Sequence, residues 1–153
     1  MKPQLKLVAG IAAGALIVIG FRMRNIDLSA RIAWGEARGE GAEGMQAVLN
    51  VMVNRAADRR WPSSLAGVAT QPWQFSAYNE NDPNRSQLEG ITDADPRFAQ
   101  AVELAARAVR GELPDITGGA THYHNNKIAP PFWTKNATVT ARIGNHIFYT
   151  GVA

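Results

Sequence analysis

The hydrophobic pattern changes its period once along the chain, and this change constrains the fold more than any other feature. Between residues 42 and 58 apolar residues recur at helical spacing. After residue 120 the stretches ATHYHN and TVTARIGNHIFYT alternate as strands do, and Gly144-Asn145 is typical of a two-residue hairpin turn. We therefore predict an α+β domain, with several helices followed by a small antiparallel sheet. The helical stripe comprises Met45, Val48, Leu49, Met52, Val53 and Ala56.

Local capping signals predict two further helices. Asp95 and Pro96 suit the N-cap and first position of a helix, and Gly111 follows its last turn. The polar stretch 25–29 predicts another helix, capped by Asp27 or Ser29, that ends at the glycines between residues 39 and 41. Turn residues dominate 63–94, where we expect loops, short helical pieces and one strand-like stretch, QFSAY.

The N-terminus is apolar and flanked by positive charge. Residues 7–21 carry no charge, with Lys2 and Lys6 before them and Arg22 and Arg24 after them. As a helix, this run would span about 22 Å, which is shorter than a bilayer core but suits the apolar part of a signal sequence. No small-x-small cleavage site follows the run. We interpret residues 1–24 as an uncleaved signal anchor and residues 25–153 as an exported domain. The anchor would tether this domain to the periplasmic side of the inner membrane. The alternative is that the apolar run forms a buried core helix.

Composition excludes several classes of function. The 153 residues carry a net charge of +3 without a clustered basic stripe, so we expect no nucleic-acid partner. Because the chain has no cysteine, it has no disulfide, thiol nucleophile or cysteine-bound zinc. The sequence also lacks a G-x-S-x-G nucleophile elbow and a phosphate-binding loop.

The stretch RIAWGEARGEGAEG contains the strongest candidate for a catalytic carboxyl group. Glu36 follows apolar residues at the predicted C-terminus of a helix, where both the apolar setting and the helix dipole favour a raised pKa. Such a carboxyl group can donate the proton that glycoside cleavage requires. Glu40 and Glu43 lie across or beyond the glycine break, where they suit solvent or the cap of the next helix. A zinc site made by His122, His124 and His146 is an alternative.

A longer set of motifs resembles one family. The stretch ARIAWGEARGEGAEGMQAVLNVMVNR is similar to the signature of the spore cortex-lytic, SleB-type cell-wall hydrolases. The likeness continues in order through LAGVATQPWQFSAY, TGGATHYHN, FWT and ARIGNHIFYT, and covers about residues 29–150. It implies a lysozyme-like fold, peptidoglycan glycan strands as the substrate, and Glu36 as the catalytic acid.

The resemblance also implies a groove that binds sugar rings. Aromatic rings would stack on the apolar faces of the sugars and amides would bond their hydroxyls; for Phe75 a place in the core is the favoured alternative. We expect a monomeric lytic transglycosylase or muramidase without a cofactor or metal. A catalytic domain on a weak anchor suits a phage endolysin, although a bacterial cell-wall remodelling enzyme could be built in the same way. The alternatives are a zinc-dependent amidase and a non-catalytic, membrane-anchored glycan-binding protein. The expected substrate-binding residues are Gln71, Trp73, Phe75, Tyr123, His124, Asn125 and Trp133.

Overall fold

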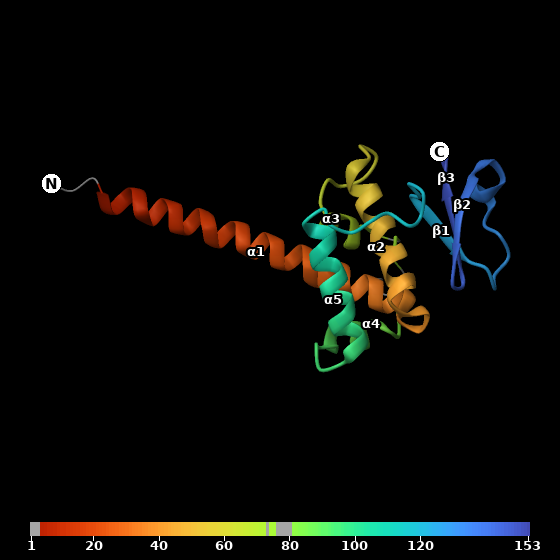
Figure 1. Ribbon diagram of the computed structural model, residues 1–153, viewed down its shortest axis with the longest axis horizontal. Helices are drawn as coiled ribbons and strands as arrows, with labels where there is room; N and C mark the ends of the chain where they lie inside the picture. The colour runs from red at the N-terminus through yellow and green to blue at the C-terminus, as the bar shows by residue number, and fades with distance from the viewer. Residues whose placement is uncertain (1–3, 73, 76–80) are drawn as a thin grey trace.

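The structure is a helical body with a small sheet beside it and one long helix that projects away from both (Figure 1). It is a computed structural model that describes residues 4–72, 74–75 and 81–153, with side chains described from residue 13 onward. The order of elements, helices first and strands last, confirms the predicted α+β class.

The first helix, α1 (Gln4–Ala37), runs without a break through the place where we predicted a helix to begin. The predicted cap at Asp27 or Ser29 is therefore wrong. The Ser29 hydroxyl and the Asn25 amide donate to carbonyl groups four residues earlier, and so these polar side chains accompany a helix that continues. The Asn25 side-chain oxygen also accepts from Ala66 N, which links α1 to the start of α3 (Leu65–Ala69). The predicted boundary between residues 24 and 25 falls inside α1.

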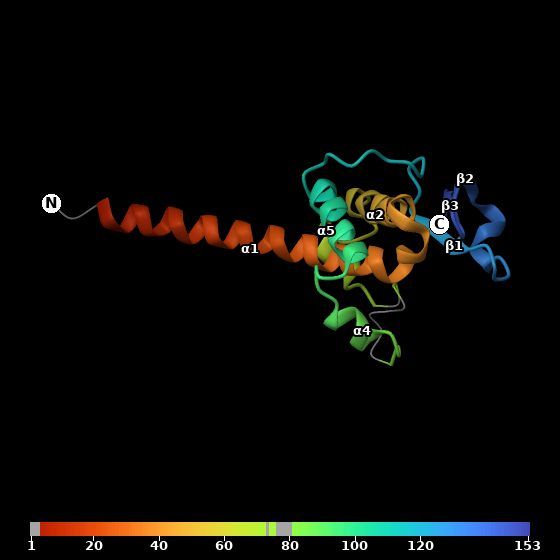
Figure 2. The same cartoon turned by 60° about the horizontal axis from the view of Figure 1, so that its bottom comes forward.

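The N-terminal half of α1 lies outside the helical body (Figures 1 and 2). Residues 13–24 are exposed, which contradicts the alternative of a buried core helix for this part of the run. In the described part of the chain, no helix has both the length and the apolar character that a membrane span needs.

Two predicted helices are confirmed and form the body together with the C-terminal half of α1. The helix α2 (Gly41–Ala57) carries the apolar stripe, and α5 (Pro96–Val109) begins where Asp95 accepts from the backbone N–H groups of Arg97 and Phe98. The short α4 (Arg85–Gly90) precedes α5. Gln74 and Phe75 of the strand-like stretch QFSAY lie in a turn and a bend, and its last three residues lie outside the described part. The core is formed chiefly by Ile32, Ala33, Met45, Val48, Leu49, Met52, Phe98, Ala101 and Ala105.

The three strands form one antiparallel sheet in the order β1-β3-β2. They are β1 (His122–Asn125), β2 (Thr138–Ile143) and β3 (His146–Thr150), and the tight turn between β2 and β3 confirms the predicted hairpin. Gly144 in that turn has φ +55°, a conformation that favours glycine.

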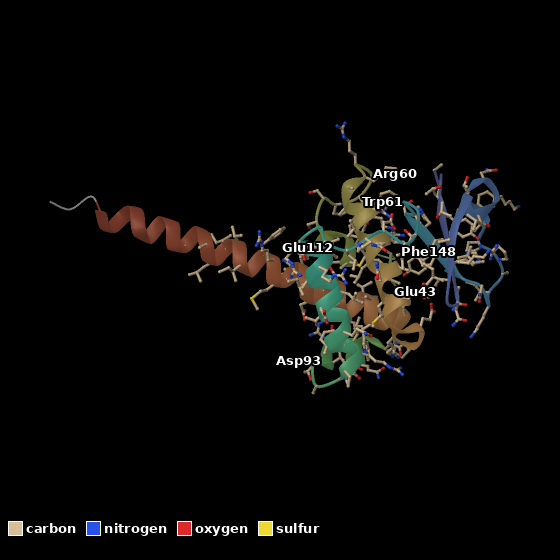
Figure 3. All side chains as sticks on the ribbon, viewed as in Figure 1. Glu43, Arg60, Trp61, Asp93, Glu112 and Phe148 are labelled. Carbon is tan, nitrogen blue, oxygen red and sulfur yellow. The ribbon has the colours of Figure 1, made fainter. Side chains whose placement is uncertain are left out.

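The two faces of the sheet have different neighbours. Tyr123 and Phe148 lie opposite each other on one face, and Phe148 packs on Ala47 and Val51 of α2. Figure 3 labels Phe148 between α2 and the strands. The other face carries His122, His124 and Tyr149, against which Trp133 of the 3-10 helix η3 (Phe132–Asn136) packs.

Candidate active site

Glu36 lies in the last turn of α1, one residue before the helix ends. A 3-10 turn, η1 (Arg38–Glu40), follows, and Gly41, with φ +71°, then begins α2 in a new direction. The change of direction leaves the Glu36 side chain between the helical body and the sheet, where the hydroxyl of Tyr123 donates to its Oε2 over 3.2 Å. The helix C-terminus predicted from the sequence is therefore where the structure places this carboxyl group.

A cavity of about 500 Å³ opens beside Glu36. Its wall combines the end of α1, the C-terminal part of α2, the segment 84–88 and strands β1 and β3. Glu36 is the one carboxylate among the described residues of this wall, and most of the others can donate or accept hydrogen bonds. The described wall comprises Trp34, Gly35, Glu36, Arg38, Arg55, Gln74, Asn84, Gln87, Leu88, Tyr123, His124, Asn125, Ile128 and His146.

The protein raises the pKa of Glu36 above its ordinary value, chiefly because burial removes water from the carboxylate. The hydrogen bond from Tyr123 and the electrostatic interactions with His146 and Arg55 oppose that rise, while Asp82 adds to it. A carboxyl group with a raised pKa keeps its proton closer to neutral pH, which is the property that a general acid requires.

Arg55 is a second buried charge in the cavity wall. Its Nε donates to the backbone oxygen of Thr121 over 2.7 Å, which ties α2 to the segment before β1. The guanidinium group is covered by the rings of Trp61 and Phe75, and its Nη1 is buried without a hydrogen-bond partner in the described structure. Burial lowers the pKa of Arg55, and the neighbouring Tyr123 and Glu36 oppose that shift.

The structure places the residues predicted from the sequence in different surroundings. Tyr123, His124 and Asn125 line the cavity together with Glu36. Phe75 is 2% exposed and lies beside the Arg55 guanidinium group, as its core alternative implied. Gln71 is not part of the described wall, and Trp133 packs on the face of the sheet that carries His122. Trp73 lies outside the described residues.

Arg55 and His146 are among the residues of the wall that were not assigned from the sequence to substrate binding or to support of the acid. Arg55 is the arginine of the N-R pair that ends the family-like stretch, so a signal existed in the motif. His146 entered only as a possible zinc ligand. Its position beside the cavity depends on the pairing of β3 with β1, which sequence spacing alone does not reveal.

The histidines do not converge as the zinc alternative requires. His146 pairs with Asn125 and shares a face with Tyr123, whereas His122 and His124 lie on the opposite face. Across the described residues, no three histidine, aspartate or glutamate side chains are grouped as a metal site needs.

Comparison with known proteins identifies the family. A family model described as cell wall hydrolase matches residues 39–149. The chain belongs to the cell wall hydrolase family. The resemblance recognised in the sequence is thereby confirmed, and so is the prediction of an enzyme.

Curated proteins that are similar to the chain include spore cortex-lytic enzymes. The enzyme of Halalkalibacterium halodurans is 33% identical over 142 residues, which are 92% of this chain and 39% of that protein. The enzyme of Bacillus subtilis is 32% identical over 133 residues, 84% of this chain and 38% of that protein. The chain thus spans about two fifths of the length of these relatives.

Two solved structures share the fold. The catalytic domain of the Bacillus cereus SleB protein superposes with a TM-score of 0.67 at 29% identity, covering 84% of this chain and 91% of that one. The catalytic domain of the germination-specific lytic transglycosylase SleB from Bacillus anthracis gives a TM-score of 0.63 at 28% identity, covering 83% and 94%. Both likenesses extend beyond the span of the family match.

Proposed function

We propose that this chain cleaves the glycan strand of peptidoglycan between N-acetylmuramic acid and N-acetylglucosamine, with Glu36 as the general acid. The observation that carries the proposal is the Glu36 carboxyl group itself. It borders an open polar cavity, accepts a hydrogen bond from Tyr123, and has a pKa raised by burial. Family membership supports the cell wall as the target.

The single described carboxylate in the cavity wall favours a lytic transglycosylase over a two-carboxylate hydrolase. A second carboxylate would have to activate water or attack the sugar. Instead, Glu36 gives its proton to the glycosidic oxygen as the bond from that oxygen to C1 of the muramic acid breaks. The 6-hydroxyl oxygen of the same sugar then bonds to C1, and its proton returns to Glu36, which yields a 1,6-anhydro sugar. One of the similar solved structures is titled a lytic transglycosylase.

Analysis of the products by mass spectrometry tests this proposal. Purified sacculi digested with the chain should release muropeptides that end in 1,6-anhydromuramic acid. Glu36→Gln keeps the shape of the side chain and removes the acid, so it should lower the rate about 10²–10⁴-fold. A hydrolase would give reducing muramic acid ends and an amidase would give free stem peptides; release of either, or of nothing, would overturn the proposed reaction.

We further propose that residues 7–21 tether the exported chain to the inner membrane and that the enzyme lyses a host cell as a phage endolysin. The support is the apolar run with basic residues on both sides, together with a row of exposed apolar side chains on α1. The described members of that row are Leu16, Ile17, Val18, Ile19, Phe21 and Met23.

Cell fractionation tests the tether. Full-length chain should sediment with membranes in energised cells, and collapse of the membrane potential with a proton ionophore should release it to the periplasm and trigger lysis. Glu36→Gln should be released in the same way without lysis. A mature protein that begins after residue 21 in both fractions would instead indicate an ordinary cleaved signal peptide.

A further inference from the structure

Glu40, the second glutamate of the G-E-A-R-G-E stretch, is bound to His146. Nδ1 of the imidazole lies 3.1 Å from both carboxylate oxygens of Glu40. The two side chains are only 10% and 7% exposed, so this pair lies largely out of water. It joins η1, directly after the helix of Glu36, to the first residue of β3.

Only one member of this pair faces the cavity. His146 lines the wall and Glu40 does not. The His146 ring also meets the Tyr123 ring edge to face, with centroids 5.0 Å apart, and Tyr123 is the residue that donates to Glu36. Glu40 thus connects to the acid through His146 and Tyr123, from behind the cavity wall.

The hairpin turn is shaped to admit Glu40. A Cβ atom added to Gly144 would overlap the Glu40 carboxylate, and one added to Gly44 would overlap the Glu40 side-chain stem. Two glycines from distant parts of the chain therefore enclose the same side chain. These contacts and the bond to His146 hold the Glu40 carboxylate outside the described cavity wall.

We propose that Glu40 and His146 form a positioning pair for Glu36: Glu40 orients the imidazole, the imidazole supports Tyr123 and interacts electrostatically with the acid, and Glu40 takes no part in bond cleavage. The inference rests on the proposed function of Glu36.

The charged and titratable groups around this pair come from several elements. The groups near His146 or near Glu36 itself are Glu40 on η1, Tyr123 and His124 on β1, and Arg55 on α2. Asp82, in the segment before α4, also interacts with Glu36. The electrostatic interaction with His146 lowers the pKa of Glu36. Removal of the imidazole should therefore leave the acid protonated up to a higher pH.

Variants at Glu40 and His146, assayed on sacculi, test the proposal. A glutamine at position 40 can still accept from the His146 N–H, so Glu40→Gln should keep activity within about fivefold of the unaltered chain. Glu40→Ala removes the acceptor and should lower activity strongly, since a displacement of about 1 Å at a catalytic group can cost about 10²-fold. The anhydro product should be unchanged in both. Glu43→Gln is the matched control, because Glu43 is an exposed glutamate three residues away.

The pH profile separates this role from a merely structural one. In His146→Gln, the loss of activity on the alkaline side should move to higher pH. An unmoved profile with a reduced rate would overturn the electrostatic part of the proposal. If Glu40→Gln were as inactive as Glu36→Gln, and formate or azide restored Glu40→Ala, Glu40 would be a second catalytic carboxylate and the positioning proposal would be wrong. Failure of the unaltered chain to cleave glycan would instead overturn the proposed function itself.

Discussion

The hydroxyl of Tyr123 donates to Oε2 of Glu36 over 3.2 Å and so joins the sheet to the last turn of the first helix. The two residues are 87 positions apart, and each belongs to a different layer of the fold. The acid is therefore set in its final surroundings only when the sheet has docked on the helical body. Sites assembled in this way are sensitive to changes at the junction between the layers.

Loss of the Tyr123 hydroxyl should change the pH dependence of the enzyme. Because its hydrogen bond lowers the pKa of Glu36, Tyr123→Phe should raise that pKa and move the alkaline limb of the rate profile to higher pH. The ring would keep its contacts with His146 and Phe148. A pH–rate profile on sacculi measures the shift. An alkaline limb that moves to lower pH would show that the hydroxyl does not stabilise the ionised form of Glu36.

Burial of Glu36 should lower the free energy of unfolding at neutral pH. Because the pKa of Glu36 is raised in the folded state, the folded chain holds its proton more tightly than the unfolded chain, and stability falls as pH rises above the ordinary value of 4.5. Glu36→Gln should therefore be more stable than the unaltered chain at pH 7, with a difference that shrinks toward pH 4. Denaturant unfolding at both pH values tests this. A variant less stable at pH 7 than the unaltered chain would contradict it.

An alanine at Gly144 should disturb both stability and activity. The positive φ costs any other residue about 1–2 kcal/mol, and the added Cβ would also displace Glu40. Gly111 is a matched control, because it has φ +71° but nothing near its added Cβ. Gly111→Ala should lose only stability, whereas Gly144→Ala should lose more stability and most activity. Equal effects of the two variants would show that the space beside Glu40 is unimportant.

The free energy of unfolding should decrease in acid because of His122, on the face of the sheet that also carries His124 and Tyr149. Burial, with help from Arg55 and Arg60, lowers the pKa of His122 from 6.5 to about 4. The folded state thus favours the neutral imidazole, so its contribution to stability is complete above pH 6.5 and is lost as pH falls toward 4. His122→Phe should flatten the decline in unfolding free energy over that range. An equally steep decline in the variant would assign the acid sensitivity to other groups.

Chelation should leave the activity unchanged. His146 lies on the opposite face of the sheet from His122 and His124, so the three imidazoles cannot share one ion. Turnover of sacculi before and after EDTA, with metal content measured on the same sample, tests this. One bound zinc per chain together with loss of turnover would favour the amidase alternative.

Local signals explain why much of the fold could be predicted. The stripe of α2, the Asp95-Pro96 start of α5 and the turn at Gly144 each act within a few residues, and all three appear in the structure. The continuity of α1 could not be predicted because Ser29 and Asn25 are residues that cap helices as readily as they bond back along them.

The acid was predictable and most of its surroundings were not. Glu36 stands beside apolar residues in the sequence, and its helix-terminal position follows from the glycines after it. Arg55 and His146 reach the cavity only through the packing of α2 and the pairing of β3, over separations of up to 106 residues. Trp133 packs on the face of the sheet that carries His124 and Tyr149 because η3 lies against that face. No local sequence pattern indicates the position of η3.

Because α1 is unbroken, the exposed N-terminal segment and the end of the helix that borders the cavity are rigidly connected. Each residue of an α-helix turns the chain by about 100° and advances it by about 1.5 Å. One alanine inserted between residues 13 and 20, where the side chains are exposed, should leave the helical body intact and rotate the cavity by about 100° about the helix axis relative to residues 4–12. Seven inserted residues would make nearly two full turns and would nearly restore the original orientation of the cavity, at a distance about 10 Å greater from residues 4–12. The orientation of the cavity and its distance from the N-terminal segment can therefore be changed independently in this chain.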